Sequence, residues 1–316
     1  MAVGTLKALC AAMDDIALDT WGRFESGRLP GHRYDETSAS DNNLAALRDR
    51  VPGLLIWQSS VSEEAKTGAD WEWWIGDDEV GWLCVRMQAK RAYADDTYDQ
   101  LRHGDAGNRQ YDKLIRGCDP AEGRFPFHVF YNGWPEGTFH EGTHWAVPAH
   151  WNACPNRKEY DECGHVEPRH YGCAIAPSGE VKQISDAGGR SRYSIVEHLS
   201  KAVPWSYAFG FPQGKPGSEE RWQAGIERRP PGGTWLDRIH GTLVVLTERG
   251  GASVARDITG HLKEIPGADR STRIFDLPDY VRTMRGTVPG LFEPEAEEEV
   301  PAAPRTVILE RKGKQR

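Results

Sequence analysis

The stretch that most constrains the fold is residues 69–90, which read ADWEWWIGDDEVGWLCVRMQAK. Two runs of tryptophan, valine, leucine and other strand-forming residues flank the segment GDDEVG, whose composition is typical of a tight turn. The pattern predicts strands at about 69–75 and 81–90 that pair as an antiparallel hairpin. Such a hairpin indicates that this part of the chain belongs to a β-sheet.

Side chains alternate between the two faces of a strand, and this divides the hairpin into an apolar face and a polar face. Positions 83, 85, 87 and 89 are all apolar, whereas arginine, glutamine and lysine occupy 86, 88 and 90. A turn centred in GDDEVG pairs Asp70 with Gln88 and Glu72 with Arg86. One face should therefore pack on the core, while the other gathers Asp70, Glu72, Gln88 and Lys90.

Hydrophobic periodicity predicts both helices and strands along the rest of the chain, which indicates an α/β protein. Helices are expected at 5–24, at a segment ending at Pro52-Gly53, at 93–117 in two pieces, at 193–202 and at 278–285. Strands are expected at 54–58, 125–133 and 242–247, with a further hairpin over 171–184. The expected organisation is an N-terminal helix in 1–29 and a core over 30–135. A C-terminal part over 136–290 should complete or decorate this core. Residues 291–316 are expected to form a disordered tail, in which TVILE can pair as an edge strand.

Composition narrows the functional classes for this chain of 316 residues. A formal net charge of −8 argues against a protein that coats nucleic acid, because such binding depends on neutralising phosphates. No apolar run reaches the roughly 20 residues of a membrane-spanning helix. Six irregularly spaced cysteines do not indicate a disulfide framework. A cytoplasmic protein is predicted.

The polar face of the hairpin has the residue types of a site for a hard cation. Mg²⁺ or Mn²⁺ prefers oxygen ligands, and Asp70, with Glu72 or Glu36 and the main-chain carbonyl of Ala89, can supply them. Lys90 can orient an attacking water or neutralise developing charge. The alternative is that opposed acidic and basic residues form ordinary cross-strand ion pairs on a solvated face.

The order helix, strand, acidic strand, Gln-x-Lys strand, helix, strand resembles the core of the PD-(D/E)XK nuclease superfamily, in the variant of the Mrr-type restriction endonucleases. This resemblance implies a restriction-endonuclease-like core and a Mg²⁺-dependent nuclease, with DNA as its substrate and bacterial defence against foreign DNA as its role. Glu36 lies where the superfamily often places a helical metal-binding Glu. Gln110 in QYDKL is similar to the Gln that follows the Lys in the RecB-like branch.

A second resemblance comes from GADWEWW, QAKR, QYDKL, VFYNG, YGCAIA and VPWSYAF in this order. Together they are similar to a bacterial family of uncharacterised proteins, over roughly residues 30–210. Gln88 departs from the usual superfamily pattern because it is neutral, which should weaken metal binding unless Glu72 compensates. Without that compensation, the expected protein is a non-catalytic nuclease-like module that binds nucleic acid or a protein partner through its Trp-rich segment 134–151.

Two further groups of residues suggest binding sites. Arg109, Lys113 and Arg116 share one face of a predicted helix and can contact a phosphate backbone, although a solvated face is an equal interpretation. A structural zinc would draw on Cys154, Cys163, His165, His170 and Cys173, but the compact cysteine pairs of such sites are missing. The acidic total charge also leads us to expect a homo-oligomer or an activating partner for DNA binding.

Overall fold

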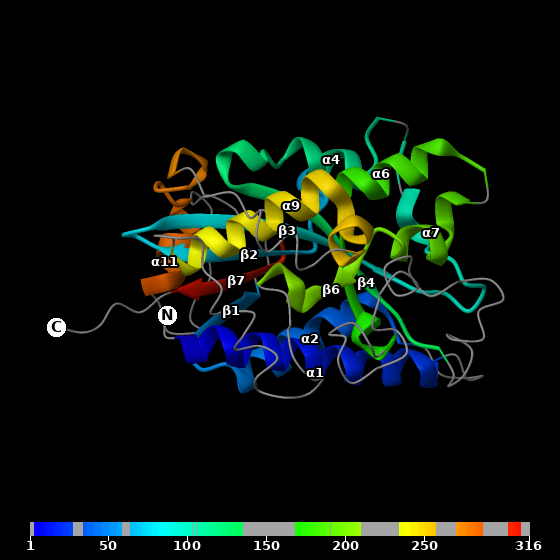
Figure 1. Cartoon of the computed structure of the whole chain (residues 1–316), viewed down its shortest axis with the longest axis horizontal. Coiled ribbons are helices and arrows are strands. Elements are labelled where there is room, and N and C mark those ends of the chain that lie inside the picture. The colour runs from blue at the N-terminus through cyan, green and yellow to red at the C-terminus, as the bar shows by residue number, and fades with distance from the viewer. Residues whose placement is uncertain are drawn as a thin grey trace.

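The computed structural model describes residues 3–27, 34–58, 64–102, 104–105, 107–134, 168–189, 191–209, 234–256, 270–286 and 303–310. The chain forms a seven-stranded mixed sheet with helices packed on its faces, which confirms the predicted α/β class (Figure 1). None of the helices in these ranges combines the length and the apolar composition needed to cross a membrane.

The sheet has the strand order β1-β7-β2-β3-β4-β5-β6. The strands are β1 (Leu54–Gln58), β2 (Trp71–Asp77), β3 (Gly81–Arg91), β4 (Arg124–Tyr131), β5 (Cys173–Pro177), β6 (Val203–Pro204) and β7 (Arg305–Glu310). The pairs β7–β2 and β3–β4 are parallel, and the other four neighbouring pairs are antiparallel. The hairpin pairs as predicted, with Glu72 opposite Arg86.

The helices connect and cover these strands. They are α1 (Val3–Gly27), α2 (Glu36–Arg50), α3 (Glu64–Thr67), α4 (Gln110–Arg116), α6 (Ser178–Ala187), α7 (Ile195–Leu199), α9 (Trp235–Arg256) and α11 (Asp279–Gly286). Short 3-10 turns occupy Asp99–Arg102, Pro120–Glu122, Pro168–Gly172, Ser191–Tyr193, Trp205–Ala208 and Arg270–Thr272. In Figure 1, α1 and α2 run along the lower side of the sheet, while α4 and α6 lie along the upper side.

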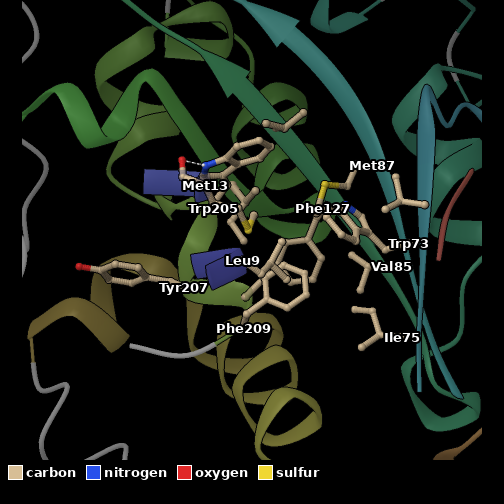
Figure 2. Close-up of a cluster of buried hydrophobic side chains, with 14 of the residues drawn as sticks. Leu9, Met13, Trp73, Ile75, Val85, Met87, Phe127, Trp205, Tyr207 and Phe209 are labelled. Carbon is tan, nitrogen blue, oxygen red and sulfur yellow. Dashed lines mark hydrogen bonds between the residues drawn. The ribbon is translucent and has the colours of Figure 1, made fainter. Parts of the chain in front are cut away.

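The main core lies between the sheet and a layer that contains α1, α2 and α9. Trp73, Ile75, Val85 and Met87, which alternate along β2 and β3, point into it. Figure 2 shows these side chains against Leu9 and Met13 of α1 and against Trp205 and Phe209, which follow β6. The apolar face predicted for the hairpin is therefore confirmed as a core face. Its opposite face packs on α11 at one end and, through β4 and β5, on α6 and α7 at the other.

Helix α1 is part of this core. At two glycines the backbone of the chain lies so close to α1 that no side chain would fit there. A Cβ at Gly172 would lie 1.9 Å from the carbonyl oxygen of Ala17, and one at Gly133 would lie 2.2 Å from that of Trp21. Only glycine allows such backbone contact. The ends of β4 and β5 are thereby held directly against the middle of α1.

Two predicted elements were wrong. Residues 171–184 form β5 followed by helix α6, not a hairpin, because Pro177 occupies the N-cap and Glu180 lies in the first turn of the helix. The run TLVVLT at 242–247 lies inside α9, not in a strand. Leu236, Ile239, Leu243 and Leu246 recur there at helical spacing and are all buried, so packing on the sheet overrides the local β-propensity.

The C-terminal pairing was predicted correctly, but its place in the sheet was not. Residues 305–310 form β7, which lies between β1 and β2 and is therefore an interior strand, not an edge strand. Residues 291–302 and 311–316 lie outside the described ranges. Because β7 lies between β1 and β2, the sheet is complete only when residues 305–310 pair with strands that lie more than 200 residues earlier in the chain.

Candidate functional site

The predicted site lies at the end of the hairpin where β2 begins and β3 ends. Asp70 immediately precedes β2, and its backbone N–H donates to the carbonyl oxygen of Met87 at 2.9 Å. Its carboxylate Oδ2 accepts a hydrogen bond from the backbone N–H of Ala89 at 2.6 Å. These two bonds extend the ladder beyond its last paired residue and fix the Asp70 side chain beside Gln88 and Lys90.

Lys90 is the point where three elements meet. Its Nζ donates to Oε1 of Gln110, the first residue of α4, at 3.3 Å, and lies 3.8 Å from Oε1 of Glu36, the first residue of α2. The lysine side chain is only 6% exposed. The structure thus brings Lys90, Gln110 and Glu36 together, although they come from three separate parts of the sequence.

Glu36 is held at the start of α2 by a local cap. The carboxylate of Asp35 accepts from the backbone N–H of Ser38 at 2.7 Å, which begins the helix at this residue. Burial raises the pKa of the Glu36 carboxyl above its ordinary value of 4.5; Lys90 opposes this shift and Asp70 adds to it. Oε2 of Glu36 is buried and has no hydrogen-bond partner among the described residues. A cation at this point would relieve both the repulsion and the unpaired oxygen.

Gln88 is the most unusual residue of the site. Its side chain is fully buried, yet neither the amide nitrogen nor the amide oxygen hydrogen bonds to any residue in the described ranges. Each buried polar group left unpaired costs about 1–3 kcal/mol, so native proteins rarely keep two on one side chain without a purpose. The amide is a candidate contact for a metal ion, a water or another ligand.

Gly68 places α4 against the start of β2, a role that the motif GADWEWW, which begins with this glycine, had not indicated. Its φ of +73° lies in the region that favours glycine, and a Cβ there would lie 2.4 Å from the carbonyl oxygen of Gln110. The close approach brings Gln110 within reach of Lys90. A glycine two residues before a candidate metal-binding Asp was the only signal available.

The structure does not bring Glu72 to this point, although it shares a strand face with Asp70. Its fully buried carboxylate accepts from the hydroxyl of Tyr280 at 2.5 Å, from Nε of Arg86 at 3.4 Å and from Oγ1 of Thr306 at 3.4 Å. Residues two apart on a strand are separated by about 6.6 Å, and here that distance moves Glu72 under α11. The expectation that Glu72 helps to bind the metal is therefore corrected.

The remaining donors provide a smaller ligand set than expected. Asp70, Glu36 and the carbonyl of Ala89 supply oxygens, and the amide oxygen of Gln88 adds a neutral one. Within the described part of the chain, no three His, Cys, Asp or Glu side chains gather closely enough to hold a metal ion by themselves. Any Mg²⁺ or Mn²⁺ held by these residues would have to keep several of its waters, as Mg²⁺ commonly does.

The basic helix face expected to contact phosphates is occupied by contacts within the protein. Arg109 Nη1 lies 2.9 Å from Asp186 Oδ1 and donates to the hydroxyl of Tyr111 at 2.6 Å. Arg116 donates to the carbonyl oxygen of Gly107 at 2.8 Å. Arg91, which follows Lys90 and is half-buried, instead stacks on the ring of Tyr93 at 3.9 Å.

Two of the five candidate zinc ligands have other partners. His170 Nε2 lies 3.6 Å from Asp14 Oδ2, and the buried thiol of Cys173 hydrogen bonds to Thr20 and Asn43, both at 3.4 Å. Cys154, Cys163 and His165 lie outside the described residues, as does most of the Trp-rich segment 134–151. The described residues thus supply no support for the zinc alternative.

Comparison with known protein families finds one family model that matches nearly the whole chain. A family model described as a family of unknown function, DUF6615, matches residues 9–315. The chain belongs to the DUF6615 family. The match extends well beyond the span of about 30–210 suggested by the short motifs, and it includes most of α1 and all of β7, the two terminal elements that complete the core and the sheet. A search of the curated proteins finds no match to the chain.

Proposed function

We propose that this DUF6615 protein is a metal-dependent nuclease that hydrolyses phosphodiester bonds in DNA. One observation carries the proposal: Asp70, Glu36 and a buried Lys90 converge next to Gln88, a buried side chain with two polar atoms that no described residue pairs. The order of the surrounding elements adds support. Hairpin β2–β3 is followed by α4 and a parallel β4, the arrangement on which the resemblance to the PD-(D/E)XK core rests.

Each residue of the site has a separate role in the proposed hydrolysis. Asp70 and Glu36 offer carboxylate oxygens to Mg²⁺ or Mn²⁺, and the amide oxygen of Gln88 can hold the ion or one of its waters. The bound ion would lower the pKa of a water and offset the charge of the attacked phosphate. Lys90 donates N–H groups toward the attacking water or a phosphate oxygen, while Gln110 fixes its direction.

Binding of the substrate must overcome an acidic protein surface. The net charge is −8, and Arg109 and Arg116 already contact groups of the protein itself. We therefore include in the proposal a homo-oligomer or an activating partner that supplies basic surface. A role in bacterial defence within the cytoplasm rests on the superfamily resemblance alone, so it is an analogy.

The test is cleavage of supercoiled plasmid, linear DNA and RNA with Mg²⁺ or Mn²⁺. Wild type is compared with Asp70→Asn and Lys90→Ala, and with Glu79→Gln as a matched control, because Glu79 is exposed at the turn of the same hairpin. Cleavage by wild type and Glu79→Gln that is lost in both site variants supports the proposal. Equal cleavage by all four proteins would indicate a contaminating nuclease and reject the site.

A second candidate function is a non-catalytic module that binds nucleic acid or a protein partner. It is favoured by one observation: Glu72 is bound elsewhere, so the neutral Gln88 is not compensated by a third carboxylate. Its signature would be DNA retention in a gel-shift assay that depends on Lys90 and occurs without cleavage under any metal condition.

A further inference from the structure

A buried histidine lies beside Gln88 on the neighbouring strand. His128 of β4 is paired in parallel register with Gln88 of β3, so the two side chains project from adjacent strands on the same face of the sheet. Both are fully buried. His128 had not been singled out in the sequence, where it stands within the apolar run FPFHVFYNG.

The His128 ring is held firmly at one nitrogen. Its Nδ1 lies 2.9 Å from Oγ of Ser178, the buried first residue of α6, and its ring stacks on Phe130 with a centroid separation of 6.1 Å. Nε2, at the far side of the ring, is buried and has no partner within the described residues. Burial, reinforced by the charges of Lys90 and His198, lowers the pKa of His128 well below 6.5, so the imidazole is neutral.

The unpaired atoms of the two side chains complement one another. Among the described residues, nothing pairs with the donor and the acceptor of the Gln88 amide or with one ring nitrogen of neutral His128. Two neighbouring residues that each leave buried polar atoms unpaired are the usual surroundings of an internal water, which makes two to four hydrogen bonds to such groups. The cost of leaving all these atoms unpaired, about 1–3 kcal/mol for each, makes a shared water the simplest arrangement.

We propose that His128, fixed by Ser178, is a positioning residue that holds the Gln88 amide through one internal water shared with Nε2. The amide oxygen then faces the Asp70 and Lys90 side, where it can contact a bound cation. The effect on the cation rests on the proposed function, whereas the hydrogen-bonded link between the two side chains does not. Outer partners of this kind orient ligands in metal sites generally.

The chain offers a matched pair of substitutions at one position. In His128→Gln the amide group reaches about as far as Nε2, and in His128→Asn it reaches only about as far as Nδ1. We therefore expect His128→Gln to keep the link to Gln88, while His128→Asn keeps only the bond to Ser178. Near-ultraviolet circular dichroism and thermal melting establish that both variants are folded. If one is not, a crystal structure of the wild-type chain decides the link by showing or lacking a water between Nε2 of His128 and the Gln88 amide.

The direct readout is the Gln88 side-chain NH₂ signal in ¹⁵N NMR spectra of the metal-free full chain, assigned by its loss in Gln88→Glu. The expected result is a signal that is protected from solvent exchange in wild type and His128→Gln but shifted and less protected in His128→Asn. An unchanged Gln88 signal in His128→Asn overturns the proposal. This measurement decides the link whether or not the protein cleaves DNA.

The second readout is Mn²⁺ affinity measured by calorimetry. Loss of an outer partner typically weakens metal binding by about 10-fold, and we expect this for His128→Asn but not for His128→Gln. In a Gln88→Ala background, His128→Asn should cause no further loss, because its effect passes through Gln88. Equal losses for both variants, or additive losses in the double variant, would contradict the proposal. A wild type that neither binds Mn²⁺ nor cleaves would reject the proposed function while leaving the NMR result decisive.

Discussion

Two polar clusters lie on the same face of the same hairpin, and their difference separates a candidate site from a structural contact. The open cluster is Asp70, Gln88, Lys90, Glu36 and Gln110; the closed cluster is Glu72, Arg86, Tyr280 and Thr306. In the closed cluster, both carboxylate oxygens of Glu72 have partners. In the open cluster, Glu36 and Gln88 retain buried atoms that no described residue satisfies.

The comparison shows that residue type does not identify the site. Each cluster contains a carboxylate near the start of β2 and a basic residue of β3. The clusters differ in whether neighbouring elements complete their hydrogen bonds. Residues of α11 and β7 do so for the Glu72 carboxylate. Residues of α2 and α4 contact Lys90 but leave polar atoms of the open cluster without a partner among the described residues. A fully paired buried charge ties elements together, while an unpaired buried group calls for another partner, such as a water or a ligand.

The largest expected effect is on stability, in the closed cluster. Glu72→Ala leaves Arg86 buried without its carboxylate, and breaking a buried ion pair in this way costs about 3–5 kcal/mol of unfolding free energy. Urea denaturation measures the loss. Tyr280→Phe, which removes one hydrogen bond, is the milder control at about 1–2 kcal/mol. A Glu72→Ala protein of wild-type stability with weakened Mn²⁺ binding would move Glu72 into the open cluster.

The next effect is on catalysis, in the open cluster. Lys90→Ala should lower the plasmid cleavage rate by about 100-fold or more, the usual result of removing one donor to developing charge. Arg86→Ala, a change of the same kind four residues earlier on the same strand, should instead destabilise the fold and leave the rate per folded molecule unchanged. Initial rates corrected for folded fraction distinguish the two. Comparable rate losses in both variants would remove the distinction between the clusters.

A smaller effect is expected from the glycine that sets the geometry of the open cluster. Gly68→Ala introduces both an unfavourable positive φ and a contact with the Gln110 backbone. Gly53→Ala is the matched control, since Gly53 has a φ of +82° but no atom within 4 Å of a Cβ. We expect Gly68→Ala to lose about 1–3 kcal/mol more than this control, the usual cost of overpacking. It should also slow cleavage by displacing Gln110 from Lys90. Thermal melts and cleavage rates of both variants test this.

The smallest effect is a pH dependence of stability from Glu36. Because burial raises the pKa of this carboxyl above 4.5, the folded protein binds its proton at a higher pH than the unfolded chain. The contribution of this carboxyl to the free energy of unfolding is fully present below pH 4.5 and is lost as the pH rises through its folded-state pKa. In metal-free buffer, wild type should therefore gain unfolding free energy relative to Glu36→Gln as the pH falls.

The comparison between wild type and Glu36→Gln removes the contribution of the histidines. Burial lowers the pKa of His198 to about 4, so this histidine destabilises the protein as the pH falls from 6.5 toward 4 in both proteins alike. Urea unfolding at several pH values gives the difference directly. A constant difference between wild type and Glu36→Gln would show that the carboxyl keeps its ordinary pKa when the protein folds.

Local patterns predicted those parts of the molecule that depend on nearby residues. Alternation along 81–90 identified the core face of β3, and the turn in GDDEVG determined the register of Glu72 and Arg86. Patterns failed where distant packing decides the outcome. The run TLVVLT is apolar enough for a strand or a helix, and only burial of its helical face against the sheet makes it part of α9.

The sequence by itself determined which side chains share a face, because alternation is a property of the extended backbone. It placed Asp70, Glu72, Gln88 and Lys90 together on that basis. Only the tertiary structure decided which of them remain available, since two of the three groups that pair with Glu72 belong to residues 280 and 306, more than 200 positions away in the chain. Hydrogen bonds depend on distance in space, so the division between the open and the closed cluster had to await the fold.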